Sequence, residues 1–143
     1  MKKFLFTVMI SCAIFVQGFS QDANEKEENP NAPEITFEEV IHDFGNIPFK
    51  ENAEYEFTFT NTGKEPLIIQ NCSTTCGCTS PTCPKNKPIK PGEKSSIKVK
   101  YVNTHLPGSF NRDITVQSNA KNASVKITIK GVVEQKTEVV ATK

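Results

Sequence analysis

The sequence predicts an all-β protein, an antiparallel β-sandwich of six or seven short strands, with an up-and-down barrel as the alternative. Three observations lead to this fold class. Apolar and polar residues alternate with a period of two through most of the middle of the chain, and no window sustains a helical period. Gly, Pro and Asn turns separate the alternating segments. Each strand is therefore expected to turn one face to a core and the other to water.

The first half of this region contains four predicted strand segments. Residues 35–37 alternate, and the chain runs on in extended form through residues 40–44. Residues 54–60 place an aromatic side chain at every second position before a turn at residues 61–64, NTGK. A short apolar run follows at residues 67–69. A run of this length bounded by turn signals is consistent with a buried strand.

The second half contains three further alternating segments. Residues 97–101 and 125–130 interleave apolar residues with Lys and Thr, and residues 114–117 follow the same pattern. The predicted core is the apolar face of all these segments: Ile35, Phe37, Phe44, Tyr55, Phe57, Phe59, Leu67, Ile69, Ile97, Val99, Tyr101, Ile114, Val116, Val125, Ile127 and Ile129.

The first 20 residues have the pattern of a secretory signal peptide. A basic start precedes the apolar run of residues 4–16, and Gly18 and Ser20 occupy the −3 and −1 positions of a cleavage site. The run is shorter than the roughly 20 apolar residues needed to span a membrane. We therefore expect export to the periplasm or cell surface, with no transmembrane anchor after cleavage. The alternative is lipidation at Cys12, although the residues before it match a lipobox poorly.

The rest of the chain divides into three parts. Residues 21–32 are polar and free of large apolar side chains, which predicts a flexible leader. Residues 33–134 carry the alternating pattern and form the predicted sandwich domain. Residues 135–143 form a predicted flexible tail. No repeat is visible at the periods of solenoids or propellers.

Charge is distributed unevenly along the exported part. Residues 21–65 hold 12 acidic and 3 basic residues, whereas residues 66–143 hold 4 acidic and 12 basic residues. The two halves nearly cancel, which gives no overall attraction to nucleic acid. The lysines are also not interleaved with the aromatic residues that stack on bases. Nucleic acid is therefore excluded as a partner.

Six motifs in a fixed order carry a resemblance to a known family: HDFGNI from His42, FTNTGKEPLII from Phe59, CGCT from Cys76, IKPGEKSSIKVKY from Ile89, GSFNRDITVQSN from Gly108 and VKITIKG from Val125. Together they resemble the secreted bacterial domain-of-unknown-function family 1573, which is similar to the immunoglobulin-like domains of the abnormal-spindle, major-sperm-protein and Hydin type. The resemblance implies an immunoglobulin-like sandwich of about seven strands, exported to the periplasm or cell surface, with no established reaction. Cys72 and Cys83 depart from the usual family pattern.

No catalytic residues or cofactors are predicted. The DFG at residues 43–45 lacks the other motifs of a kinase, so we expect Phe44 in the core and a turn at Gly45. The nucleophile elbow GxSxG is absent. His42 and His105 allow a cysteine–histidine pair only on paper, and ordinary polar roles are favoured for both.

Four cysteines, Cys72, Cys76, Cys78 and Cys83, lie within 12 residues of one another. In an oxidising compartment an even, clustered set predicts disulfides, and four cysteines allow three pairings. Geometry favours Cys72 with Cys83 at the base of a loop, because a Cys76–Cys78 bridge would close a tight ring. The pairing remains open at this stage.

Two alternatives use the same cysteines as thiolates. Cys76 and Cys78 could hold Zn²⁺ or Cu(I), although the C-x₃-C-x-C-x₄-C spacing is not that of a zinc ribbon. A thiol-redox role is the other alternative, although the CxxC motif of thioredoxin-like enzymes is missing. The favoured prediction is a set of disulfides with no bound metal.

The segment 71–92 is the predicted functional site, a long loop made rigid by cysteines and prolines. Lys85, Lys87 and Lys90 give it a positive charge and make it the candidate partner-binding loop. The sequence thus predicts a non-catalytic, exported interaction module of the cell envelope that binds an unknown envelope protein or glycan. It specifies neither the partner nor the oligomeric state.

Overall fold

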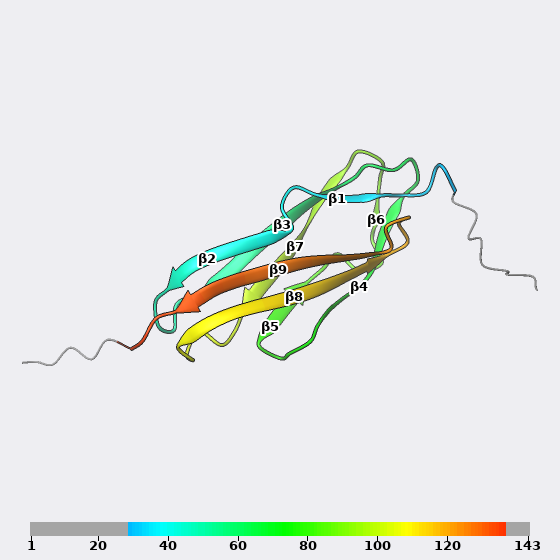
Figure 1. Ribbon diagram of the computed structural model, residues 1–143. Helices are drawn as coiled ribbons and strands as arrows, with labels where there is room; N and C mark the ends of the chain where they lie inside the picture. Colours follow the sequence, from blue (N-terminus) through cyan, green and yellow to red (C-terminus); the bar gives the residue numbers. More distant parts are fainter. Residues whose placement is uncertain (1–28, 137–143) are drawn as a thin grey trace, which may run out of the picture.

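A computed structural model describes residues 29–136 and confirms the immunoglobulin-like β-sandwich (Figure 1). The predicted signal peptide with Cys12, most of the leader and residues 137–143 lie outside the described part. Within that part there are nine strands where about seven were predicted: β1 (Ile35–Phe37), β2 (Ile41–Ile47), β3 (Ala53–Asn61), β4 (Leu67–Thr74), β5 (Thr79–Thr82), β6 (Pro88–Ile89), β7 (Lys94–Tyr101), β8 (Gly108–Ser118) and β9 (Ser124–Val133).

The two additional strands, β5 and β6, lie inside the segment 71–92 that was predicted to be one long loop. Each is short and contains a proline, Pro81 or Pro88. Neither has the apolar alternation that identifies a half-buried strand. They are held as edge strands by longer neighbours, β5 by β7 and β6 by β4, where proline is tolerated.

The strands form two sheets, with the order β1-β3-β7-β5 in one and β2-β9-β8-β4-β6 in the other. From β1 to β8 each strand belongs to the other sheet from the strand before it, so the chain crosses between the layers repeatedly (Figure 1). Only β8 and β9 are consecutive strands of the same sheet. One pairing departs from the predicted antiparallel arrangement. β2 runs parallel to β9 and shifts register between Asp43 and Asn46.

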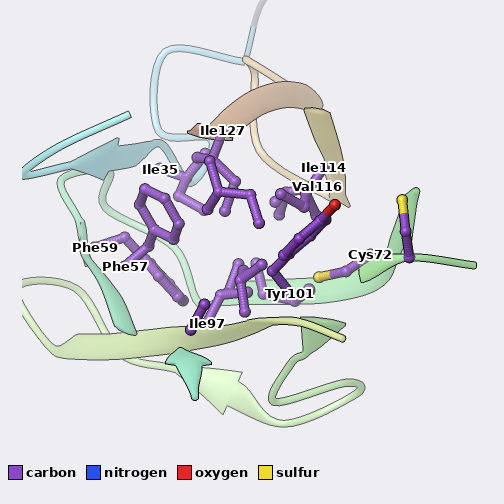
Figure 2. Close-up of a cluster of buried hydrophobic side chains, with 14 of the residues drawn as sticks. Ile35, Phe57, Phe59, Cys72, Ile97, Tyr101, Ile114, Val116 and Ile127 are labelled. Carbon is purple, nitrogen blue, oxygen red and sulfur yellow. The ribbon is translucent and has the colours of Figure 1, made fainter. Parts of the chain in front are cut away.

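The core between the sheets matches most of the predicted residues (Figure 2). Phe57, Phe59, Ile97, Ile114 and Ile127 have no solvent exposure. Four predicted core residues are only half-buried and pack at its margin: Phe37, Phe44, Tyr55 and Val125. Several core residues were not predicted, namely Ile47, Ala53, Cys72, Cys78, Ile89, Phe110, Ala120 and Val133.

Phe110 is the largest core residue that the alternation pattern did not identify. Its ring stacks on Tyr101 with centroids 3.8 Å apart, and it lies 6.3 Å from the ring of Phe44. Phe110 stands four residues before Ile114, which is two periods of the alternation, so it lies on the same face of β8 but outside the predicted segment. The two rings close the core at the end of the sandwich where β8 begins.

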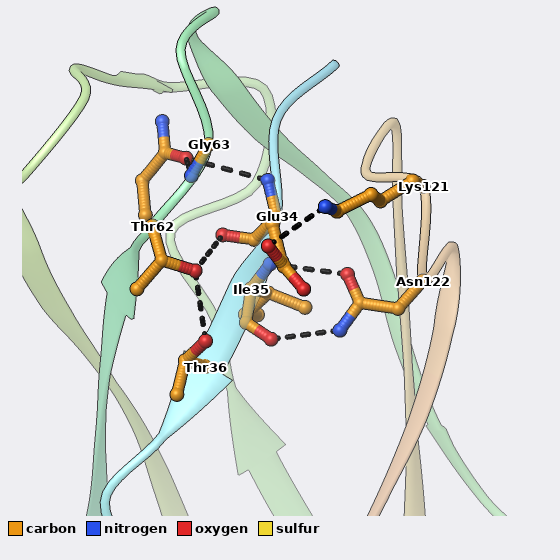
Figure 3. Close-up of polar contacts among 8 residues, drawn as sticks. Glu34, Ile35, Thr36, Thr62, Gly63, Lys121 and Asn122 are labelled. Carbon is orange, nitrogen blue, oxygen red and sulfur yellow. Dashed lines mark hydrogen bonds and ion pairs between the residues drawn. The ribbon is translucent and has the colours of Figure 1, made fainter. Parts of the chain in front are cut away.

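The short strand β1 is fixed by polar contacts at both of its neighbours (Figure 3). The side chain of Asn122 accepts a hydrogen bond from Ile35 N–H at 3.1 Å and donates one to Ile35 C=O at 2.8 Å. On the same side Lys121 forms an ion pair with Glu34 at 2.9 Å. On the other side Thr62 N–H donates to Glu34 C=O at 2.9 Å. These contacts give three residues of strand a defined register.

Gly63 lets the β1 segment approach closely. A Cβ built at Gly63 would lie 2.5 Å from the backbone of Ala32, Pro33 and Glu34. Real Cβ atoms do not come this close to backbone atoms, so the segment that enters β1 requires glycine at this position. The NTGK turn predicted at residues 61–64 thus has a packing function as well as a conformational one.

Asn61, at the end of β3, is fully buried and has partners on both atoms of its amide. Its Nδ2 donates to Glu65 C=O at 2.8 Å and to Ile89 C=O at 3.0 Å. Its Oδ1 accepts from Gly63 N–H at 3.0 Å and from Glu34 N–H at 3.4 Å. One side chain therefore joins the entry to β1, the turn after β3 and the strand β6.

We expect Asn61→Ala to lower the free energy of unfolding by about 2–4 kcal/mol, because it leaves several buried backbone groups without partners. Asn61→Asp should be no milder, since a carboxylate cannot donate to the two carbonyls and would be buried as a charge. Urea denaturation measures both. Asn119→Ala is the matched control: Asn119 is exposed and makes two hydrogen bonds, to Ile68 N–H and Pro66 C=O. Equal losses for Asn61→Ala and Asn119→Ala would contradict the central role of Asn61.

Candidate functional site

The four cysteines form two disulfides within the segment predicted to be functional. The first joins Cys72, in the middle of β4, to Cys83, directly after β5, with 6.5 Å between the Cα atoms. Cys72 is buried opposite Val116 of β8. Because β4 and β5 belong to different sheets, this bridge fastens one layer of the sandwich to the other at its edge. It is the pairing that geometry favoured at the level of the sequence.

The second disulfide joins Cys76 to Cys78, with 5.4 Å between the Cα atoms. The expectation that so tight a ring is disfavoured was wrong. That argument assumed an extended segment, whereas residues 75–78 form a turn between β4 and β5. Gly77 stands at the tip of the turn, where an added Cβ would meet nothing within 4 Å. As members of a disulfide, Cys76 and Cys78 have no thiolate to offer a soft metal.

Arg112 was not predicted as a site residue, yet its side chain contacts the second disulfide. Its Nε donates to Cys78 Sγ at 3.1 Å, and its Nη1 donates to Asn111 C=O at 3.0 Å. Arg112 lies on β8 and is half-buried, and Cys78 is buried with only 7% exposure. The guanidinium is thus held against one sulfur of the bridge, while the other cysteine, Cys76, is half-buried.

The predicted loop is not a single surface. β6 pairs with the start of β4 at Leu67, whereas the Cys76–Cys78 turn follows the end of β4 at Thr74. The eight residues of β4 span roughly 23 Å at the rise of a strand. Lys87 and Lys90, which flank β6, therefore lie at the end of the sandwich away from the Cys76–Cys78 turn, whereas Lys85 lies beside Ile69 and Asn71 in the middle of β4. Figure 1 shows β6 and the β4–β5 turn at opposite ends of β4.

Three lysines, Lys85, Lys87 and Lys90, surround β6 and are exposed. Within residues 29–136 none of them forms an ion pair, whereas five other lysines of the sandwich pair with a carboxylate: Lys94, Lys98, Lys121, Lys126 and Lys130. Lys85 donates to the neutral Asn71 Oδ1 at 2.8 Å. The segment 85–90 thus presents three lysine side chains without an ion pair among the described residues, and the carboxylate of Glu93 beside it accepts from the Lys90 backbone N–H at 2.9 Å.

The lysine segment is tied to the sheet by its backbone. Asn86 N–H donates to Ile69 C=O at 2.9 Å, and Lys85 N–H donates to Cys83 C=O at 2.8 Å. Asn86 adopts a left-handed conformation, φ 57°, which asparagine tolerates better than most residues. The Cys72–Cys83 bridge directly precedes the segment, and β6 lies within it. The lysines therefore project from an ordered backbone.

The two histidines have no part in a nucleophilic pair, because the four described cysteines are all in disulfides. His42 stacks on Tyr55 with ring centroids 3.5 Å apart. The hydroxyl of Tyr55 donates to Glu39 at 2.7 Å, and this hydrogen bond raises the pKa of Tyr55. His105 is exposed in the turn between β7 and β8.

The DFG segment has structural contacts. Asp43 accepts a hydrogen bond from Gly45 N–H at 2.9 Å and pairs with Lys130 at 3.2 Å, and these contacts lower the pKa of Asp43. Gly45 has a φ of 62°, which favours glycine, and Phe44 packs against the core. No group of three or more His, Cys, Asp or Glu residues within the described part is arranged to hold a metal ion.

Residues 35–133 match the family described as a protein of unknown function, DUF1573. The chain belongs to this family. The match covers every strand of the sandwich, from the start of β1 to the end of β9. Comparison with curated proteins found no match. Membership of DUF1573 assigns no function to the chain.

Solved structures similar to this DUF1573 protein agree with the immunoglobulin-like fold. A protein of unknown function from Porphyromonas gingivalis W83 is 18% identical with a TM-score of 0.62, over 72% of this chain and 48% of that one. A human ASH/PapD-like domain of CEP192 is 9% identical with a TM-score of 0.61, over 76% and 90%. The Vibrio cholerae VesB protease is 16% identical with a TM-score of 0.56, over 71% and 32%. The chain thus spans about half of the first protein and a third of the protease, and at these identities the likeness is one of fold.

The two disulfides are expected to differ in their effect on stability. The chain-entropy relation gives about 3 kcal/mol for the longer Cys72–Cys83 loop and about 1.5 kcal/mol for the Cys76–Cys78 ring, whose sequence separations are 11 and 2. Cys72→Ser with Cys83→Ser should therefore lower the free energy of unfolding by about twice as much as Cys76→Ser with Cys78→Ser. Urea denaturation of the two double variants measures this, and a larger loss for the Cys76/Cys78 variant would refute it.

Proposed function

We propose that this protein is a non-catalytic, exported interaction module of the cell envelope, and that it binds an anionic partner, protein or glycan, through the segment 85–90. The observation that carries the proposal is the clustering within six positions of three exposed lysines, Lys85, Lys87 and Lys90, that form no ion pair within the described residues. Five other lysines are paired with carboxylates, and Lys50, Lys64 and Lys100, which also lack an ion pair within residues 29–136, are dispersed along the chain. Exposed lysines without an acidic partner in the same chain remain available to the acidic groups of another molecule.

The ordered backbone of the segment supports a role in recognition. A rigid loop loses little conformational entropy when a partner binds, so more of the contact energy contributes to affinity. The Cys72–Cys83 disulfide, the hydrogen bond from Asn86 N–H to Ile69 C=O and the pairing of β6 with β4 all limit its motion. Loops held by a rigid scaffold commonly carry binding functions.

Two features support an extracytoplasmic location. The two disulfides are typical of an oxidising compartment, and the first 20 residues have the pattern of a signal peptide. Among the described residues, none belongs to a helix that is long and apolar enough to cross a membrane. Residence in the periplasm or at the cell surface is part of the proposal, with lipidation at Cys12 as the alternative route to the membrane.

The non-catalytic role is supported by the chemistry of the described side chains. The four cysteines in disulfides provide no thiolate nucleophile, and both histidines have surroundings that suit structural or surface roles. The DUF1573 family has no assigned reaction. We therefore propose that the sandwich acts by binding other molecules through its surface.

The test replaces Lys85, Lys87 and Lys90 together by Gln. Each exposed charge contact contributes about 0.5 kcal/mol, so we expect capture of the partner from the envelope fraction to fall about tenfold while the melting temperature stays the same. The measurement is an affinity pull-down with the captured species quantified by mass spectrometry at two salt concentrations.

The matched control replaces Lys94, Lys98 and Lys126 by Gln, which removes the same net charge from lysines that already have acidic partners. This variant should capture the partner as the parent protein does. If both triple variants lose capture equally, net charge alone is responsible and the assignment to the segment 85–90 is wrong.

A further inference from the structure

We propose that the Cys76–Cys78 disulfide is an exchangeable redox centre that accepts two electrons from a dithiol protein, with Arg112 stabilising the thiolate that forms at Cys78. The Cys72–Cys83 disulfide stays intact and structural. This activity is independent of the lysine segment, because Lys87 and Lys90 flank β6 at the Leu67 end of β4 and the disulfide lies beyond Thr74 at the other end. Either proposal can therefore fail without the other.

The surroundings of the two sulfurs give the exchange a direction. Gly77 is exposed with open space around it, and Cys76 beside it is half-buried, so an incoming thiolate can approach Cys76. Cys78 is buried, and its Sγ accepts a hydrogen bond from Arg112 Nε at 3.1 Å. Attack is easier at the accessible sulfur, and departure is easier from the sulfur whose negative charge is stabilised.

The step balances as an ordinary thiol–disulfide exchange. A thiolate of the dithiol partner attacks Cys76 Sγ, the Cys76–Cys78 bond breaks, and Cys78 leaves as a thiolate beside the Arg112 guanidinium. The second partner thiolate then attacks the partner sulfur of the mixed disulfide and releases Cys76 as a thiolate. Two protons from the partner thiols or solvent complete the two cysteine thiols. The partner is oxidised to its disulfide, and this chain is reduced by two electrons.

The fold tolerates reduction at this position. Cys76 and Cys78 are two residues apart in the β4–β5 turn, so opening their ring frees little chain. Cys72 and Cys83 enclose the whole turn and keep β4 next to β5 when the smaller ring is open. The larger bridge therefore keeps Cys78, directly before β5, next to Arg112 in both redox states.

The experiment titrates the disulfide-intact full chain with dithiothreitol and, in parallel, with reduced thioredoxin as a protein dithiol. Free thiols are trapped by alkylation and mapped by mass spectrometry. We expect Cys76 and Cys78 to be alkylated at a reductant concentration at which Cys72 and Cys83 are not, in a protein that still melts cooperatively. Reduction of both bridges in one step, reduction of Cys72–Cys83 first, or no exchange with thioredoxin would each overturn the proposal.

Arg112→Gln tests the role of the guanidinium. Loss of a charge-assisted hydrogen bond to the leaving sulfur should slow reduction by dithiothreitol about tenfold, and Arg112→Lys should restore part of the rate. Lys121→Gln, which removes a cation near the start of β1, is the control and should react as the parent does. A melting curve for each variant separates a local effect from unfolding. If folded Arg112→Gln is reduced at the parent rate, Arg112 has no part in the exchange.

Discussion

The hydrogen bonds of the buried Asn61 side chain hold together the segments that meet where β3 ends. A buried polar group is stable only when its hydrogen bonds are complete, and the partners of Asn61 come from three separate parts of the chain. The backbone of Asn61 adds two more bonds, its N–H to Glu93 C=O and its C=O from Gly92 N–H. The entry to β1, the turn after β3, the strand β6 and the turn that follows it are consequently placed relative to a single residue.

Alternation predicts correctly the strands whose own residues are apolar on one face and polar on the other. Phe57 and Phe59 of β3, or Ile127 and Ile129 of β9, would be apolar on one side in any sandwich, so a local pattern suffices. β5 and β6 have no such pattern, because they exist through pairing with β7 and β4. The parallel pairing of β2 with β9 could not be predicted from the sequence either, since it depends on how the chain crosses between the sheets and not on any residue of β2.

The sequence identified the cysteines and lysines of the candidate site by type and spacing, but not Arg112 or the geometry. The separation of β6 from the Cys76–Cys78 turn follows from β4, which runs between them. The Cys76–Cys78 pairing depends on the turn at residues 75–78, and the local sequence is compatible with this turn but does not predict it. Arg112 reaches Cys78 from 34 residues away, and a contact across that distance leaves no trace in a local motif.

The strand order also determines how much of each sheet edge is open to a second molecule. An open sheet edge invites a second molecule to extend the sheet, which is the first step toward fibrils. Three of the four edges here are too short to serve as templates: β1 has three residues, β5 has four with a proline, and β6 has two with a proline. The longer edge, β2, is interrupted at Gly45, whose N–H is already bonded to the Asp43 carboxylate. The repeated crossing of the chain between layers thus leaves each sheet ending in short or interrupted strands, which offer a second copy few consecutive backbone groups to pair with.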